Sequence, residues 1–328
     1  MRALISGISG FAGSHLAELL LREGLEVYGT IRVRSRMDNI EHIKKDLHLI
    51  ECDLRDALSM ELVIKESNPD LVFHLAAQSY VPMSWKAPAD TIETNVVGTI
   101  NLYEAVRKAD INPVIQFAGS SEEYGMVYSD ELPIFEDNEL RPLSTYGVSK
   151  VAGDKLSYQY VQSYGMRIVI TRGFNHSGPR RGEVFATSNF AKQIAEIENG
   201  AEPIIHVGNL EALRDFTDVR DMVRAYYLAI QECDYGIPYN ICSGQSISIQ
   251  SMLSRLLSMS KVEIEVQEDK ARMRPSDVEI LQGNCDRFKV RTGWERSYTF
   301  DETLEDLLNF WRDNVTQKIN TRARGEAK

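Results

Sequence analysis

The chain has 328 residues, of which 43% are hydrophobic, so it can form one large domain or two ordinary ones with a full core. Its net charge of −11 and the lack of a basic stripe argue against nucleic acid or an anionic membrane as a partner. No apolar run reaches the length of a membrane span, and four scattered cysteines predict reduced thiols in a cytoplasmic protein.

The first fifteen residues predict a strand, a glycine turn and a helix. An apolar run, RALIS, is followed by Gly7, Gly10 and Gly13 and then by the amphipathic segment HLAELLLREG. Gly7 allows a tight turn, Gly10 a close approach of backbone to phosphate, and Gly13 the packing of helix on strand. The free N–H groups at a helix start favour anions. We expect a dinucleotide here, contacted also by Phe11 and Ala12; an ordinary βα turn is the alternative.

Apolar and amphipathic segments then alternate, which predicts an α/β fold with a doubly wound parallel sheet of the Rossmann type. Strands are predicted at residues 3–6, 26–31, 47–51, 71–75, 113–118 and 167–171. Helices are predicted between them at residues 13–23, 58–67, 87–109 and 146–164.

The alternation loosens in the second half of the chain. We expect residues 1–173 to form the nucleotide-binding domain. Residues 174–318 are expected to form mostly a smaller α/β substrate lobe over the carboxyl ends of the strands, with some segments returning to the first domain. A final helix is predicted at residues 303–312. Residues 319–328 are polar and without periodicity, so a disordered tail is expected.

The end of the second predicted strand indicates which dinucleotide binds. An acidic residue there would accept hydrogen bonds from the ribose of NAD, but the chain has Arg32, followed by Arg34 and Arg36. Guanidinium groups pair well with phosphate, so NADP is favoured and NAD is the alternative. A solvated surface or an oligomer contact would also explain these arginines. Further cofactor contacts are expected at the ends of the third and fourth strands: Asp53 at the adenine, Leu54, Leu75, Ala76 and Ala77.

Tyr146 and Lys150 lie four residues apart in YGVSK and therefore share one face of a helix. An unperturbed tyrosine is neutral at pH 7, and a nearby ammonium favours its phenolate. Such a phenolate can take a proton from a sugar hydroxyl while a hydride leaves the same carbon. The pair alone is common on helices, and it gains weight from the glycine turn.

The segment AGSSEEYG directly follows the fifth predicted strand. Ser120 lies at the carboxyl end, where active sites of open sheets form, and can bridge a substrate hydroxyl and the phenolate. Glu122 can act as base at a carbon next to a ketone and then as acid towards a leaving hydroxyl. The alternative is that both merely cap the loop. Glu123 is the ambiguous neighbour, for which a solvated position is the simple interpretation.

Together these motifs resemble the extended short-chain dehydrogenase/reductase family, in its nucleotide-sugar branch. The resemblance covers nearly the whole chain and includes GISGFAG, LAAQS, SSE, YGVSK, FNHSGPRRG, LRDFTDVRD and RPSD. Within the branch the chain is most similar to GDP-mannose 4,6-dehydratases and to the sister GDP-4-keto-6-deoxymannose reductases. SSE fits the dehydratase pattern, whereas GFAGSH and DFTDVRD look more like the reductases.

The resemblance implies a GDP-sugar as substrate. It implies that Asn175 contacts the sugar diphosphate, that Arg180 lies at the nucleotide, and that Arg214 and Arg274 contact the GDP moiety; Ser79 is expected to contact the substrate too. A buried diphosphate needs such guanidinium partners. The family also implies a homodimer or homotetramer.

The expected reaction is the 4,6-dehydration of GDP-mannose or of a GDP-manno-heptose. Tyr146 would deprotonate the C4 hydroxyl as NADP takes the hydride. Glu122 would then remove the C5 proton, and water would leave C6 with help from Ser120 before the hydride returns to C6. The rivals are a reductase that consumes NADPH, a bifunctional enzyme, and an inactive NADP-binding sensor.

The six histidines show no metal-ligand spacing, so no metal is expected. His74 is predicted to be a core residue on its strand. His176 is expected either to line the site or to pack a loop.

Overall fold

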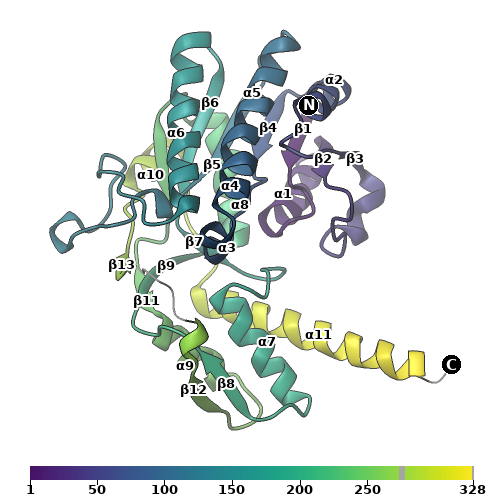
Figure 1. Cartoon of the computed structure of the whole chain (residues 1–328), viewed down its shortest axis with the longest axis vertical. Helices are drawn as coiled ribbons and strands as arrows, with labels where there is room; N and C mark the ends of the chain where they lie inside the picture. Colours follow the sequence, from purple (N-terminus) through teal and green to yellow (C-terminus); the bar gives the residue numbers. More distant parts are fainter. Residues whose placement is uncertain (273–277, 327–328) are drawn as a thin grey trace.

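The computed structural model describes the backbone of residues 1–272 and 278–326, and side chains up to residue 320. Its centre is a seven-stranded sheet in the order β10-β6-β5-β4-β1-β2-β3, and every pair in it is parallel (Figure 1). The strands are β1 (Arg2–Ser6), β2 (Glu26–Ile31), β3 (Leu47–Glu51), β4 (Leu71–His74), β5 (Val114–Ser120), β6 (Arg167–Gly173) and β10 (Pro238–Ile241). The strand order reverses beside β1, where open α/β sheets bind their ligands.

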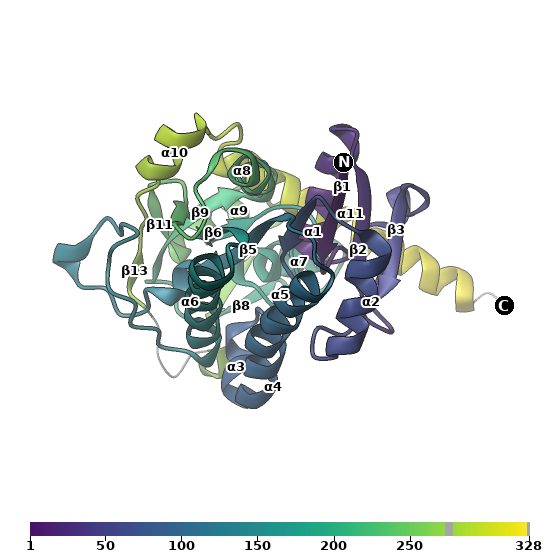
Figure 2. The same ribbon diagram turned by 90° about the horizontal axis from the view of Figure 1, so that it is seen from above.

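Helices cover both faces of this sheet, which explains why its central strands are mostly apolar (Figure 2). One face packs on α1 (Phe11–Arg22) and α8 (Val219–Glu232). The other packs on α2 (Ala57–Ser67), α5 (Gly98–Lys108) and α6 (Thr145–Tyr164). The Rossmann-type fold predicted from the alternation is confirmed, with the predicted strand and helix ends shifted by at most a few residues.

The predicted helix at 87–109 is one continuous run with an irregular middle. After α3 (Val81–Lys86), it consists of α4 (Pro88–Ile92), a π-helical turn η2 (Glu93–Val97) and α5. A π turn inserts one residue into the helical repeat and is common at functional sites. Here it places Asn95 toward the carboxyl end of β4.

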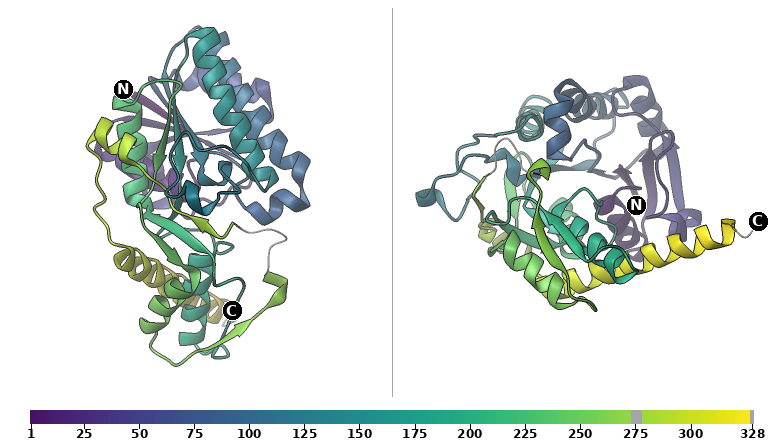
Figure 3. Two further views of the ribbon diagram at one scale, coloured as in Figure 1. Left: turned by 90° about the vertical axis from the view of Figure 1, so that its left-hand side faces the viewer. Right: turned by 60° about the horizontal axis from the view of Figure 1, so that its bottom comes forward.

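The second lobe lies below the carboxyl ends of the strands (Figure 1, and left view of Figure 3). One small sheet joins β7 (Asn175–Ser177), β9 (Leu213–Asp218), β11 (Ser246–Ser248) and β13 (Ile280–Leu281). A second pairs β8 (Ile204–Val207) with β12 (Glu265–Glu268). A separate apolar core joins them to α7 (Ala186–Glu198), α9 (Ile249–Ser258) and α11 (Phe300–Glu326).

Segments of the second half do return to the central sheet. β10 extends the sheet beside β6, α8 covers one face, and α10 (Asp286–Thr292) packs against both. The remaining elements are short 3₁₀ turns: η1 (Glu41–Asp46), η3 (Ser121–Glu123), η4 (Ser129–Glu131) and η5 (Lys270–Arg272).

The C-terminal part differs from the sequence prediction. The last helix was expected to end at Arg312, but α11 continues to Glu326, so residues 319–326 are helical rather than irregular. The apolar positions Leu304, Leu307, Leu308 and Trp311 anchor its first half in the lobe core. A helix anchored in this way can extend through polar residues without a periodic apolar face.

Candidate active site

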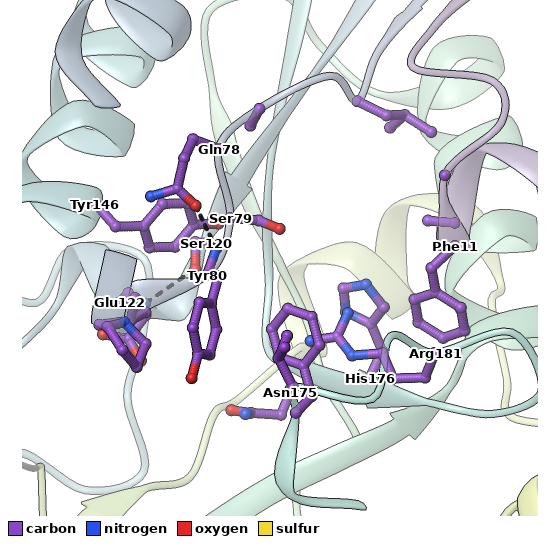
Figure 4. A pocket seen from close by; sticks show the side chains of 18 of the residues that line it. Phe11, Gln78, Ser79, Tyr80, Ser120, Glu122, Tyr146, Asn175, His176 and Arg181 are labelled. Carbon is purple, nitrogen blue, oxygen red and sulfur yellow. Dashed lines mark hydrogen bonds between the residues drawn. The ribbon is translucent and has the colours of Figure 1, made fainter. Parts of the chain in front are cut away.

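A cavity of about 1350 Å³ lies where the carboxyl ends of the sheet meet the second lobe (Figure 4). Pockets for one small molecule usually enclose about 300–1000 Å³, so this cavity has room for two ligands in contact. It is lined by these residues predicted from the sequence: Gly7, Gly10, Phe11, Ala12, Gly13, Arg32, Asp53, Leu54, Leu75, Ala76, Ala77, Ser79, Ser120, Glu122, Tyr146, Lys150, Asn175 and Arg214.

The glycine turn has the geometry that a dinucleotide requires. Gly7 has a φ of 74°, in the left-handed region that favours glycine. A Cβ on Gly13 would lie 2.4 Å from the carbonyl oxygen of Gly7, so only glycine lets α1 pack this close to the turn. Gly10 precedes the helix, and its own N–H is bound to the Gly7 carbonyl at 3.0 Å. The start of α1 therefore faces the cavity with the features that favour an anion.

The cavity wall after β2 carries Arg32 and Ser35, whose hydroxyl accepts the Arg32 N–H at 2.9 Å. Arg36 instead pairs with Asp38 on the surface. Asp53 also lines this part, but Arg55 binds both its oxygens and holds its pKa below the usual value. A cation and a hydroxyl thus lie where a 2′-phosphate would be bound, which fits NADP.

Tyr146, Ser120 and Glu122 come together at the end of β5. The Tyr146 phenol and the Ser120 hydroxyl are hydrogen-bonded to each other. Ser120 Oγ also accepts the backbone N–H of Glu122 at 3.2 Å, so Ser120 caps η3 as well as facing the phenol (Figure 4). Glu122 lines the same cavity and its charge acts on Tyr146. Capping and a place in the site are therefore compatible for Ser120.

The electrostatics of Tyr146 differ from the sequence prediction. Burial raises the pKa of Tyr146 to about 12, and the nearby carboxylates of Glu122 and Glu123 raise it too. Lys150 Nζ lies 5.9 Å from the ring centroid and donates to the Ala118 carbonyl at 2.7 Å, and its positive charge does not outweigh the effect of burial on this pKa. Burial lowers the pKa of Lys150 itself to about 8.

Arg181, which sequence reasoning missed, also favours the Tyr146 phenolate through its positive charge. Arg181 lines the cavity, and its guanidinium lies over two rings, 3.5 Å from the centroid of Phe185 and 5.0 Å from that of Phe11 (Figure 4). Burial lowers its pKa to about 10. No acidic side chain in residues 1–272 and 278–320 forms an ion pair with it.

Arg180, which was expected at the nucleotide, does not line the cavity. It has a φ of 72°, which turns its side chain away, and its guanidinium binds Glu18 and Ser14 on α1. Adjacent residues in an irregular loop point in different directions without a period, so the doublet RR could not show which arginine faces the ligand. Arg274, the other predicted contact, lies outside the described residues.

Glu123 was expected in solvent but is fully buried. It accepts the Ser120 N–H at 2.7 Å and lies 3.4 Å from Arg172. Burial and the charge of Asp154 raise its pKa to about 8. The apolar pattern of β5 does not reveal that Glu123 is buried, because its partner Arg172 lies on the neighbouring strand β6.

Two histidines and one asparagine complete the surroundings. His74 is a core residue, as predicted, between the Ser6 and Thr99 hydroxyls. His176 lines the cavity and stacks on Phe11 with centroids 5.7 Å apart. Asn95, which sequence reasoning missed, binds both backbone groups of Gln78 and the Ser149 hydroxyl, and so ties the segment after β4 to α6.

Within the described ranges, no three histidines, cysteines or carboxylates gather as a metal site. None of the helices described there is long and apolar enough to cross a membrane.

Comparisons with known proteins cover nearly the whole chain. A protein-family model described as GDP-mannose 4,6 dehydratase matches residues 4–307. A Pseudomonas aeruginosa protein named GDP-6-deoxy-D-mannose reductase is 33% identical over 97% of this chain and 99% of its own. A Yersinia enterocolitica GDP-mannose 4,6-dehydratase is 31% identical over 94% of this chain and 92% of its own.

Solved structures agree with the fold. The structure of RMD from Pseudomonas aeruginosa complexed with NADPH superimposes with a TM-score of 0.83 and 31% identity, covering 96% of this chain and 100% of that one. UDP-glucose 4-epimerase from Thermus thermophilus, in complex with NAD, gives a TM-score of 0.85 and 30% identity over 95% of this chain and 99% of that one.

Proposed function

We propose that this chain, which belongs to the GDP-mannose 4,6-dehydratase family, is an NADP-dependent 4,6-dehydratase of GDP-D-mannose or of a close GDP-manno-sugar such as a GDP-manno-heptose. The observation that carries the proposal is Glu122, which lines the cavity beside the hydrogen-bonded Ser120 and Tyr146. Elimination of water needs a base for the C5 proton, and reduction of a ketone does not.

The residues around the glycine turn fit the cofactor. The start of α1 would hold the pyrophosphate, Arg32 and Ser35 the 2′-phosphate, and Lys150 the nicotinamide ribose. Arg181 supplies a further cation between the turn and the second lobe. When bound, NADP would supply the hydride acceptor for C4 and return the hydride to C6.

The chain's own residues move the protons. Tyr146 accepts the proton of the C4 hydroxyl, and Ser120 bridges that hydroxyl and the phenol. Burial opposes the phenolate in the structure, so the positive charges of Arg181 and Lys150 have to favour it. Glu122 takes the C5 proton next to the C4 ketone and delivers a proton to the leaving C6 hydroxyl, which departs as water. When C6 takes up the hydride, C5 regains a proton from solvent and Tyr146 releases the proton that it accepted, so the protons balance.

The second lobe supplies the substrate site. Asn175 and Arg214 line the far half of the cavity, and Lys192 and Arg272 add positive charge there. A diphosphate enclosed in such a cleft requires cationic partners. A GDP-sugar with its sugar toward Tyr146 and its diphosphate toward the lobe would satisfy these groups.

The alternative is a GDP-4-keto-6-deoxy-D-mannose reductase, or a bifunctional enzyme. It is favoured by the relative named as a reductase, which at 33% is slightly more similar than the dehydratases at 31%. A reductase would use Tyr146, Ser120 and Lys150 in the same way and would leave Glu122 without a proton to remove.

The test is incubation of the protein with GDP-mannose and a catalytic amount of NADP⁺, with the product read by mass. A product that has lost one water, with no net change in reduced nicotinamide absorbance, supports the dehydratase. A second assay supplies NADPH and a GDP-4-keto-6-deoxy sugar. Steady loss of the NADPH absorbance there, without dehydration of GDP-mannose in the first assay, would support the reductase instead.

A further inference from the structure

The buried carboxyl group of Glu123 has no role in the proposed proton transfers, yet it lies directly behind them. Its Oε1 accepts the backbone N–H of Ser120 at 2.7 Å, and its Oε2 lies 3.4 Å from Arg172 Nε. A Cβ on Gly119 would lie 2.5 Å from Oε1, so the carboxyl group is pressed against the end of β5. Among the described residues, only Oε1 has a hydrogen-bond donor, and Oε2 faces the arginine without a hydrogen bond.

These contacts fix the residue that faces the phenol. The backbone of Ser120 is held by Glu123, and its hydroxyl by the Glu122 N–H and by Tyr146. Without the Glu123 acceptor, the Ser120 N–H would be buried and unpaired, or the turn would move to find another partner. Either change displaces the Ser120 hydroxyl from Tyr146.

The same carboxyl group belongs to a buried charge network. Arg172 also binds Asp154 on α6 at 2.9 Å and the Tyr124 hydroxyl at 3.0 Å. Asp154 follows Lys150 by four residues, so both lie on the buried face of α6 that also carries the reactive tyrosine.

We propose that Glu123 is a positioning residue for the reaction, whose buried carboxyl group holds the Ser120 backbone and thereby keeps the Ser120 hydroxyl facing Tyr146. The chemical step that it assists rests on the proposed function. The contact with Ser120 does not, because it is a property of the folded chain.

The hold on Ser120 does not need the charge of Glu123. Burial and the charge of Asp154 raise the pKa of Glu123 to about 8, so its carboxyl group is mostly protonated at neutral pH. A protonated carboxyl group still accepts the Ser120 N–H through its carbonyl oxygen.

Groups that face Glu123 itself are Arg172 from β6, Asp154 and Lys150 from α6, and the adjacent Tyr124. Asp154 shares the arginine with Glu123 but is not the acceptor of the Ser120 N–H. Asp154→Asn is therefore the matched control, since it also removes one carboxyl group from the same network.

The decisive variant is Glu123→Asp, whose shorter side chain withdraws from Ser120. We expect kcat per folded molecule to fall by roughly tenfold at every pH, the value of one hydrogen bond, while KM stays near wild type. The Ser120 amide proton should also exchange faster with solvent, as measured by hydrogen exchange. Asp154→Asn should change neither value.

Glu123→Gln keeps the length of the side chain and an acceptor for the Ser120 N–H, so it should restore both values. Wild-type kcat and wild-type exchange of the Ser120 amide in Glu123→Asp would overturn the proposal. So would losses that follow only the folded fraction. Absence of turnover in the wild type would instead refute the proposed function, and the exchange of the Ser120 amide would still decide this proposal.

Discussion

Gly147, the residue after Tyr146, allows the start of α6 to approach the turn that carries Glu122. A Cβ at this position would lie 2.6 Å from the Glu122 carbonyl oxygen, whereas ordinary contact begins at 3.4 Å. In Gly147→Ala the carbonyl has to retreat by about 0.8 Å, and with it the Glu122 side chain. A misplacement of about 1 Å can cost roughly a hundredfold in rate, so we expect kcat to fall by roughly tenfold to a hundredfold.

Stability should change far less than the rate. Gly147 lies in the first turn of α6, where alanine is favoured over glycine by at most about 1 kcal/mol, which offsets part of an overlap cost of about 1–3 kcal/mol. The assay is water loss from GDP-mannose per folded molecule, with thermal unfolding measured in parallel. Gly165→Ala is the control, because Gly165 ends the same helix with a φ of 67° and no atoms around its Cβ position. It should lose stability and keep its rate. Wild-type kcat in Gly147→Ala would refute the reasoning.

Three further predictions follow from the cavity wall. Arg181→Met should weaken NADP binding by about tenfold to a hundredfold, the value of a hydrogen bond to a charged group, whereas Arg180→Met should change it little; nucleotide titration by fluorescence compares the two. Arg32→Ala should weaken binding of NADP but not of NAD by a similar factor, and equal losses for both would contradict the 2′-phosphate assignment. Since burial lowers the pKa of Lys150 to about 8, kcat should decline as the pH rises through that value, and a rate that stays flat to pH 10 would count against a charged lysine.

The periodic parts of this fold were predictable, and the loops were not. Strands such as Glu26–Ile31 and Leu47–Glu51 agree with the prediction residue for residue, because each is a short, mostly apolar run that polar or turn residues bound. The glycine turn and the pair of Tyr146 and Lys150 were found because their spacing is set by local geometry. That they share one cavity with Ser120 and Glu122 follows from the parallel sheet.

What the sequence could not show depends on contacts between distant segments. Arg180 and Arg181 differ only in the backbone of one loop, which turns the first toward α1 and the second into the cavity. Glu123 was assigned to solvent because its partner, Arg172, lies on another strand. The raised pKa of Tyr146 depends on burial, which the spacing to Lys150 does not reveal. The homo-oligomer stays a prediction.

The central claim is that Glu122 removes the C5 proton, and it can be measured directly. GDP-mannose is incubated in D₂O with catalytic NADP⁺ and either the wild type or Glu122→Gln, and the product is analysed by mass and NMR. We expect the wild type to form a keto product that has lost water and carries one solvent deuterium at C5, and Glu122→Gln to form none. An equal yield of the deuterated product from Glu122→Gln would contradict it.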